Sequence, residues 1–300
     1  MWFRNLRIYR LRLSPALVLA DVEAALARHP LPRCGSFEMA SRGWVFPRQE
    51  GVFVHAVNRQ WLVALGVEQK LLPATVIRQT AQERAAAIEA EQGRKVGRKE
   101  MRDIAERVSE ELMPKAFTRR RTTWAWIDPA HGWLAVDAGS DARADEFMET
   151  LLSTLDSVAP RPLQTQVSPI SAMTEWIAGC EPPAGFTLDS DLELRTASEA
   201  QAAIRYVHHD IGGPEIAAHV AAGKVATRLG MTWNDRISFV LADKLHIKRL
   251  AFLDVLKEQA EQAAEGGDEQ FDADFALMAG ELAGMFDDLL VALGGELKPE

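Results

Sequence analysis

The sequence predicts an α+β protein, in which antiparallel or mixed sheets carry a projecting helical hairpin and C-terminal helices. The reason is order, because strand-like and helix-like runs do not alternate regularly along the chain, as they do in a doubly wound sheet. The composition, with 47% hydrophobic and 26% charged residues, is typical of a folded globular chain of any class. At 300 residues, such a chain is long enough to bury a large core.

The first 74 residues are expected to form an N-terminal sheet module. Residues 3–13 have the pattern of a strand. A helix should follow from Ser14 to Arg28, because a hydroxyl cap followed by proline is a helix-start signal. Shorter strands are expected where Gly, Pro and Asn separate apolar runs, at 44–46, 52–57 and 61–66.

Residues 75–117 are expected to form the helical hairpin. Two segments have apolar residues at helical spacing, namely Ile77, Ala81, Ala85 and Ile88 in the first and Met101, Ile104, Val108 and Leu112 in the second. Gly93 and Gly97 interrupt them, and Pro114 ends the second. The apolar stripe is narrow and the charges are many, which favours an arm that projects from the sheet.

Three further modules are expected after the hairpin. Residues 118–180 should pack on the N-terminal module, with a β-hairpin at 122–136 and helices at 141–155 and after Ser168. Residues 181–255 should be rich in strands, with a short helix after Pro214 and strands at 191–196, 201–207, 224–233, 236–242 and 246–253. Residues 256–300 should be helical, because apolar residues recur at helical spacing from about 273 to 293.

The net charge of −9 is an average over two different halves. Residues 1–121 hold 22 Lys+Arg against 13 Asp+Glu, whereas residues 122–300 hold 12 against 30. This asymmetry is typical of a chain with a polyanion-facing surface at one end and an acidic surface at the other, although helix surfaces also differ in charge by chance. Charge alone does not decide between these interpretations.

Catalytic signatures are absent from the sequence. It contains no GxxxxGK[ST], GxGxxG, HExxH or GxSxG motif, so neither an enzyme nor a bound cofactor is predicted. The two cysteines, Cys34 and Cys180, exclude a disulfide framework or a zinc ribbon and favour a reducing cytoplasm. The longest segment without a charged residue, 162–174, is too short to span a bilayer, so no membrane partner is expected.

Two groups of residues could hold a metal ion, and each has a simpler interpretation. His208 and His209 are adjacent, but neighbours on a strand point to opposite faces and rarely share one ion. Asp272 and Asp274 could hold a divalent ion, or could stabilise the start of the last helix through its dipole. The simpler interpretation is preferred in both cases.

Three basic sets are the stronger candidates for a binding site. The first surrounds the hairpin turn and consists of Arg94, Lys95, Arg98, Lys99 and Arg102. The second follows Pro114 and consists of Lys115, Arg119, Arg120 and Arg121, with Phe117 among them. Cations on a projecting element suit contact with phosphates, although the first set could equally be a solvated helix face.

The third basic set follows three consecutive predicted strands and consists of Lys224, Arg228, Arg236, Lys244, Lys248 and Arg249. Lys224 and Arg228 are expected on one sheet face, because their spacing is even, and Arg236 joins them if the intervening turn keeps the register. A basic sheet face is less common than a basic helix face, so ligand contact is predicted here.

Seven segments along the chain, taken in order, are distinctive: MWFRNLRIYRL at the start, CGSFEMASRGWV at 34–45, KLLPATVIRQ at 70–79, EAEQGRK at 89–95, LMPKAFTRRRTTWAWID at 112–128, AGKVATRLGMTWNDRISFVL at 222–241 and FDADFALMAGELAGMFDDLLVALGGE at 271–296. Through these segments, the sequence as a whole resembles the RdgC family of bacterial recombination-associated proteins. No single segment is catalytic, but their combination and order are specific.

The resemblance implies a nucleoid-associated, non-enzymatic protein that binds DNA with little sequence preference and restrains the RecA recombinase. It also implies a ring-shaped homodimer with a basic central hole. By position, Phe117 would be the contact between the two hairpin tips, with Lys115 beside it, and Lys224 would face the DNA. Where the family has a basic residue and glutamine, this chain has His208 and His209, whose contribution to DNA binding should strengthen below about pH 6.5.

Three functions remain to be distinguished. The leading hypothesis is a DNA-encircling dimer that limits access of RecA to double-stranded or single-stranded DNA. The second is a protein-interaction factor that contacts the recombinase through its acidic C-terminal part, with DNA binding incidental. The third is a metal-dependent nuclease that uses the region of Asp272 and Asp274.

Overall fold

The computed structural model describes residues 1–13, 18–48, 51–155, 158–179, 181–196, 202–262 and 266–297. The chain divides into two compact units. We call residues 1–22, 54–63 and 124–300 the sheet unit, and residues 23–53 and 64–123 the arm unit. In the described part of the chain, no helix combines the length and apolar character needed to cross a membrane.

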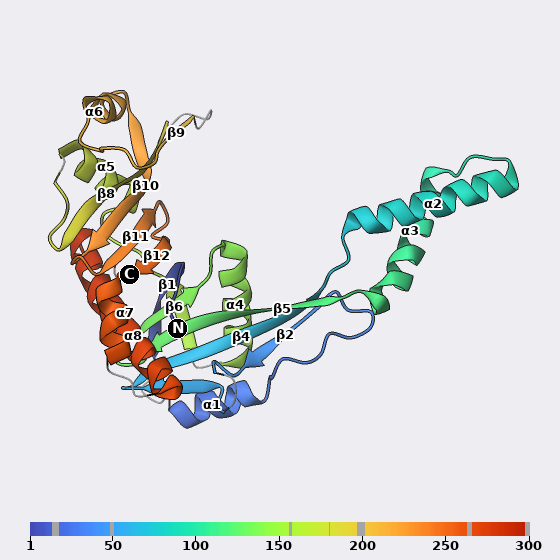
Figure 1. Cartoon of the computed structure of the whole chain (residues 1–300), viewed down its shortest axis with the longest axis horizontal. Helices are drawn as coiled ribbons and strands as arrows, with labels where there is room; N and C mark the ends of the chain where they lie inside the picture. The colour runs from blue at the N-terminus through green and yellow to red at the C-terminus, as the bar shows by residue number, and fades with distance from the viewer. Residues whose placement is uncertain are drawn as a thin grey trace. The chain divides into compact units, whose positions relative to one another are not determined.

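The sheet unit is built on antiparallel strands (Figure 1). Neighbouring strands follow the order β5, β6, β1, β12, β11, β10, β8, β9, while β7 pairs with β1 and β3 pairs with β4. Their bounds are β1 Leu6–Leu13, β3 Val54–Val57, β6 Trp133–Asp137, β7 Val158–Pro162, β8 Phe186–Thr196, β9 Ala203–Tyr206, β10 Lys224–Trp233, β11 Ile237–Ala242 and β12 Ile247–Phe252. Strands β4 (Gln60–Lys70) and β5 (Thr118–Asp128) contribute residues to both units.

Helices cover one face of strands β8 to β12. These helices are α5 (Pro169–Gly179), α6 (Pro214–Ala221), α7 (Asp254–Gln262) and α8 (Gly267–Ala292), while α4 (Asp141–Thr154) contacts β6. Alternate residues of β11, Ile237 and Phe239, are buried in one cluster with Phe275 and Met278 of α8. Because side chains alternate along a strand, the residues between them point to the opposite face. We call that opposite face of β8 to β12 the open face, and there Ser238 and Val240 are half-buried.

The arm unit contains the helical hairpin, whose two helices lie side by side (Figure 1). Helix α2 spans Ala74–Gln92, α3 spans Arg98–Leu112, and a short 3-10 helix follows at Met113–Lys115. Their small core consists of Ala81, Ala85, Ile104 and Val108. Gly93 ends α2 with a φ of 65°, a conformation that glycine adopts without strain. Strand β2 (Ala40–Val45) pairs with the second half of β4, and α1 (Leu19–Ala27) begins in the sheet unit and ends in this one.

Most elements agree with the sequence-based expectations, including the α+β class and the hairpin of residues 74–112. Strand β7 was not expected, because its sequence VAPRP contains two prolines, yet it pairs with β1. The last helix begins at Gly267, earlier than about 273. The predicted start of the first helix at Ser14 and the thiol of Cys180 lie outside the described residues.

The aromatic core of the sheet unit provides a test of this packing. Phe286 of α8 is 1% exposed, and its ring centroid lies 5.9 Å from that of Trp126 and 5.2 Å from that of Trp133. We expect Phe286→Ala to lower the free energy of unfolding by about 3–5 kcal/mol, because it leaves a cavity. Val291 on the same helix is 80% exposed, so Val291→Ala should change the free energy of unfolding by less than about 0.5 kcal/mol. Urea denaturation measures both, and equal effects would contradict the packing.

Candidate nucleic-acid interface

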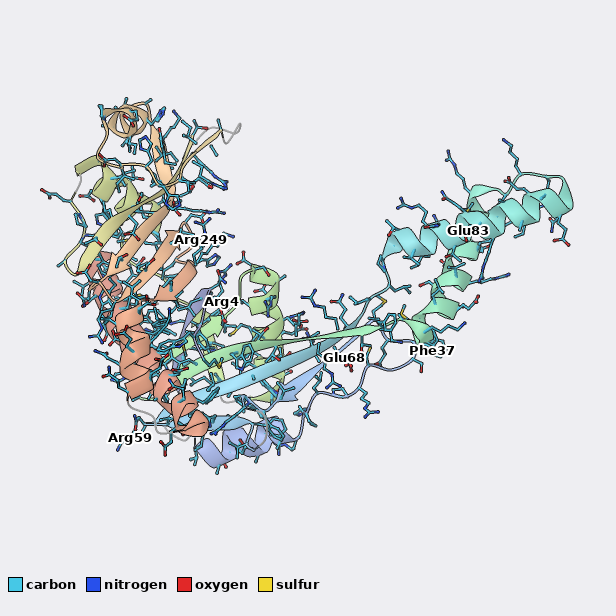
Figure 2. All side chains as sticks on the ribbon, viewed as in Figure 1. Arg4, Phe37, Arg59, Glu68, Glu83 and Arg249 are labelled. Atoms are coloured by element: carbon cyan, nitrogen blue, oxygen red, sulfur yellow. The ribbon has the colours of Figure 1, made fainter. Side chains whose placement is uncertain are left out.

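A bulge in β12 places two neighbouring cations on the open face. Ser238 of β11 pairs with Ala251, but Val240 pairs with Lys248. Between these two pairs, β12 therefore contains one more residue than β11. Arg249 has a φ of 50° at this irregularity. An extra residue reverses the alternation of side chains. Lys248 and Arg249 therefore both lie on the open face, although they are adjacent in sequence. Arg249 is labelled in Figure 2.

A second bulge separates Lys224 from Arg228, which corrects the expectation that they share a face. Ala226 of β10 pairs with Leu194 and Arg228 with Glu193, so one residue of β10 is skipped between them. Lys224 consequently lies on the face that the helices cover, where its Nζ is 2.8 Å from Nδ1 of His219 in α6. Arg228 lies on the open face. The prediction from the spacing of four residues between Lys224 and Arg228 was wrong, because that prediction assumed a strand without a bulge.

Arg236 is also directed away from the open face. It follows the turn after β10, where Asn234 and Asp235 have φ values of 46° and 54°. Its Nη2 donates to Oε1 of Glu281 in α8 at 2.9 Å and to Oε1 of Gln259 in α7 at 3.1 Å. Burial raises the pKa of Glu281, and the charge of Arg236 opposes that rise. The turn between β10 and β11 therefore does not place the Arg236 side chain on the same face of the sheet as Arg228.

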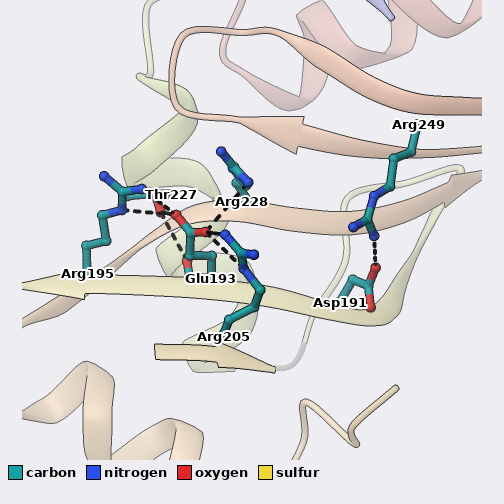
Figure 3. A network of polar contacts seen from close by, with 7 residues as sticks. All are labelled: Asp191, Glu193, Arg195, Arg205, Thr227, Arg228 and Arg249. Atoms are coloured by element: carbon teal, nitrogen blue, oxygen red, sulfur yellow. Dashed lines mark hydrogen bonds and ion pairs between the residues drawn. The ribbon is translucent and has the colours of Figure 1, made fainter. Parts of the chain in front are cut away.

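Two further arginines belong to the open face and were missed in the sequence. Arg195 lies on β8 and Arg205 on the neighbouring β9, and both point toward Glu193 (Figure 3). Arg205 pairs in register with Glu193 across the two strands, although they are 12 residues apart. We call Arg195, Arg205, Arg228, Lys248 and Arg249 the basic face. The only signal for the missing pair was an alternation of charged and apolar residues in 191–196, which contains Arg195.

Glu193 contacts three arginines of the basic face, Arg195, Arg205 and Arg228. Its side chain is 3% exposed, and its two carboxylate oxygens accept hydrogen bonds from Arg195 Nε at 3.0 Å, Arg205 Nη2 at 2.6 Å and Thr227 Oγ1 at 3.1 Å. Arg228 Nη1 lies 3.6 Å from Oε2. Burial by itself raises the pKa of Glu193, but these hydrogen bonds and the charge of Arg228 together lower it to about 2. The carboxylate is therefore ionised at neutral pH.

Every residue of the basic face except Arg195 lines a hollow of about 150 Å³. The carboxylates of Asp191 and Glu193 lie in the same lining. At its rim, Arg249 Nη1 donates to Asp191 Oδ2 at 2.6 Å. Lys248 has no ion-pair partner among the described residues. Its pKa is lowered by burial first and then by the positive charges of Arg228 and Arg7. Cations that converge on one hollow create a positive potential there, which favours an anionic ligand.

The basic residues of the arm unit differ in how far they are already paired. Arg94 forms two hydrogen bonds with Glu100, at 2.7 and 2.8 Å, and Arg120 Nε donates to Glu68 at 3.2 Å. The other predicted residues of this unit are exposed and form no ion pair within the described ranges, namely Lys95, Arg98, Lys115 and Arg119. Phe117 is 83% exposed, and its carbonyl accepts a hydrogen bond from the Leu71 N–H at 2.7 Å.

The predicted geometry of two metal candidates needs correction. His208 and His209 are not on a strand, because β9 ends at Tyr206; His208 has a φ of 53°, and His209 Nε2 lies 3.3 Å from Glu215. Asp272 and Asp274 are not in the first turn of α8, which begins at Gly267. Within the described residues, no group of three or more His, Cys, Asp or Glu side chains is placed to hold a metal ion.

Asp272 instead accepts a hydrogen bond from an imidazole. Its Oδ1 lies 2.8 Å from Nε2 of His55, which is on β3 of the same unit. Asp274 accepts a hydrogen bond from Gln270 Nε2 at 2.8 Å, one turn earlier in α8. Both carboxylates thus hold neighbouring groups in place rather than the start of the helix.

The low pKa of Glu193 predicts how acid affects stability. Because its pKa falls from 4.5 to about 2 on folding, the ionised carboxylate stabilises the protein above pH 4.5, and this contribution is lost as the pH falls toward 2. The full contribution is about 3 kcal/mol. We expect Glu193→Gln to be less stable than the wild type in urea at about pH 6, with the difference shrinking by about pH 3. A difference that does not depend on pH would contradict the assigned pKa.

Comparison with known proteins identifies relatives along the whole chain. The family model described as "Putative exonuclease, RdgC" matches residues 1–296. The recombination-associated protein RdgC of Dechloromonas aromatica is 54% identical over 300 residues, covering 99% of each chain. The protein of the same name from Cupriavidus pinatubonensis is 51% identical over 298 residues, covering 99% of this chain and all of the relative. This chain therefore belongs to the RdgC family.

Proposed function

We propose that this protein binds DNA with little sequence preference through the basic face of its sheet unit, and that it acts in homologous recombination. The names of its relatives support the recombination role. The observation that carries DNA binding is the hollow at which Arg205, Arg228, Lys248 and Arg249 converge. Phosphates are the abundant anions of DNA, and contacts with them supply most of its sequence-independent affinity.

The shape of this surface favours contact with the backbone rather than with bases. Its cations project from strands of a sheet, whereas direct base recognition usually requires a helix or a two-stranded ribbon inserted into the major groove. The net charge of −9 does not oppose this proposal, because the local potential of a concentrated basic surface determines where a polyanion binds.

The finer proposal is a homodimer that encloses DNA in the nucleoid and limits the access of RecA. Two copies double each basic surface, and enclosure adds persistence that phosphate contacts alone do not provide. Phe117 is proposed as the contact between the two hairpin tips, since a phenylalanine with 83% exposure has little to pack against within its own chain. Lys115 would lie beside that contact, and His208 and His209 would lie near the DNA. Lys224 contacts His219 on the helix-covered face, so it would have to reach DNA from outside the basic face.

The alternative is direct contact with the recombinase through the acidic C-terminal part, where residues 122–300 hold 30 Asp+Glu against 12 Lys+Arg. In this alternative, DNA binding is incidental to inhibition.

The family description also raises an exonuclease activity. We propose a non-enzymatic role, and prolonged incubation of linear and circular DNA with the protein and Mg²⁺ tests it, because shortened DNA would assign nuclease activity instead.

The basic face can be tested by charge reversal. We expect the double variant Arg228→Glu/Lys248→Glu to weaken DNA binding at least about tenfold and to reduce the salt slope by about two, because it removes two phosphate contacts. The control is Lys257→Glu, since Lys257 lies on α7 and pairs with Asp254 at 3.2 Å. Fluorescence anisotropy with duplex DNA between about 50 and 200 mM salt measures both. Equal losses in the two variants would refute a localised interface.

The same double variant separates the two modes of inhibition. If the protein limits RecA by occupying DNA, the variant should lose DNA retention and inhibition of strand exchange together. Inhibition that survives without DNA retention would support direct contact with the recombinase.

The tip contact is tested by Phe117→Ala. We expect the variant to leave circular DNA faster than the wild type at high salt, because a small apolar contact between two tips has few neighbours to replace it. Val291→Ala, which removes an equally exposed apolar side chain from α8, is the control. Equal retention of the wild type and Phe117→Ala would contradict the proposed closure.

A further inference from the structure

We propose that Glu193 is a built-in competitor for DNA phosphates, which occupies the arginines of the basic face and thereby limits its affinity for DNA. This inference rests on the proposed DNA binding. It concerns the strength of DNA binding. It explains why a carboxylate lies at the centre of a surface that is proposed to bind an anion.

The bonding of Glu193 resembles that of a bound phosphate. Arg195 contacts Oε1 through Nε and Nη2, at 3.0 and 2.9 Å, and Arg205 contacts Oε2 through Nε and Nη2, at 3.2 and 2.6 Å. Each guanidinium thus directs two nitrogens at one carboxylate oxygen, and guanidinium nitrogens donate in the same way to phosphate oxygens. The donors that hold Glu193 are therefore the donors that a DNA phosphate would use.

Glu193 cannot leave this position, whereas the arginines can. Its side chain is 3% exposed on β8, between pairing partners Arg205 on β9 and Arg228 on β10. The side chains of Arg195, Arg205 and Arg228 are 38%, 60% and 38% exposed. DNA must therefore draw arginine donors away from a fixed, ionised carboxylate, or share them with it.

The direction of the effect follows from charge. A negative charge within several ångströms of a bound phosphate opposes binding, and its removal should strengthen binding by roughly 3- to 30-fold for effective dielectric constants between water and a protein surface. The released arginines should also displace more counterions, so the salt dependence should become steeper. A residue with only a structural role would not produce tighter binding when removed.

A matched control exists on the covered side of the same unit. Glu296 also binds two arginines, Arg10 at 2.8 Å and Arg161 at 2.9 Å. Arg10 stacks on Trp133 and lies on the same face of β1 as the buried Leu6 and Ile8. Glu296→Gln therefore makes the same change in net charge without freeing a cation of the basic face.

The experiment compares the affinity of the wild type, Glu193→Gln and Glu296→Gln for one duplex DNA over a salt series, together with their stability in urea. We expect Glu193→Gln to bind roughly 3- to 30-fold more tightly with a steeper salt slope, although it is less stable. Glu296→Gln should bind like the wild type. An equal gain in both variants would indicate a general charge effect and would overturn the inference, as would equal or weaker binding by Glu193→Gln.

A second variant keeps the test decisive if Glu193→Gln does not fold. Asp191→Asn removes a second carboxylate of this surface and frees only Arg249, in a pair whose side chains are 27% and 70% exposed. It should also bind DNA more tightly, by a smaller factor, and unchanged or weaker binding would overturn the inference. If the wild type does not bind DNA, both the inference and the proposed function fall. If the wild type binds and neither variant gains, only the inference does.

Discussion

The one-sided burial of the sheet in the sheet unit determines where its charges can lie. Helices α5 to α8 cover one face of β8 to β12 with apolar contacts, so a cation on that face must find a polar partner at the edge of the core, as Lys224 does with His219 and Arg236 with Glu281. The opposite face has no such constraint. The cations there converge on a shared hollow and on one another, and the positive potential of the surface follows from this convergence.

Two bulges adjust this pattern by a single residue each. In β12 the bulge adds Arg249 to Lys248 on the open face, and in β10 it brings Arg228 opposite Glu193 while Lys224 turns toward α6. Without the bulge in β12, strict alternation would place Lys248 and Arg249 on opposite faces of the sheet. Irregular strands thus build the candidate interface, which is consistent with the frequent occurrence of bulges at functional surfaces.

The buried carboxylate of Glu193 reconciles a dense group of arginines with a stable fold. Three guanidinium groups that approach one another repel, and an ionised carboxylate among them offsets that repulsion and orients them. The same carboxylate reduces the charge available to an external anion. Stability and affinity for such an anion are therefore opposed at this position.

The sequence by itself determined the helical hairpin and the approximate position of most strands, because hydrophobic period is a local property that neighbouring residues impose. The stripes through Ile77 to Ile88 and Met101 to Leu112 illustrate this, since both became the contact between α2 and α3. The sequence missed β7 and several strand ends, such as the start of β8 at Phe186. Family membership could also be recognised from the order of short segments along the chain. The tertiary structure alone decided which cations meet. Arg205 reaches Glu193 only through pairing between strands, and a one-residue bulge reverses the face of Lys224 relative to Arg228. Register depends on hydrogen bonds between segments distant in sequence, which spacing within one strand does not encode.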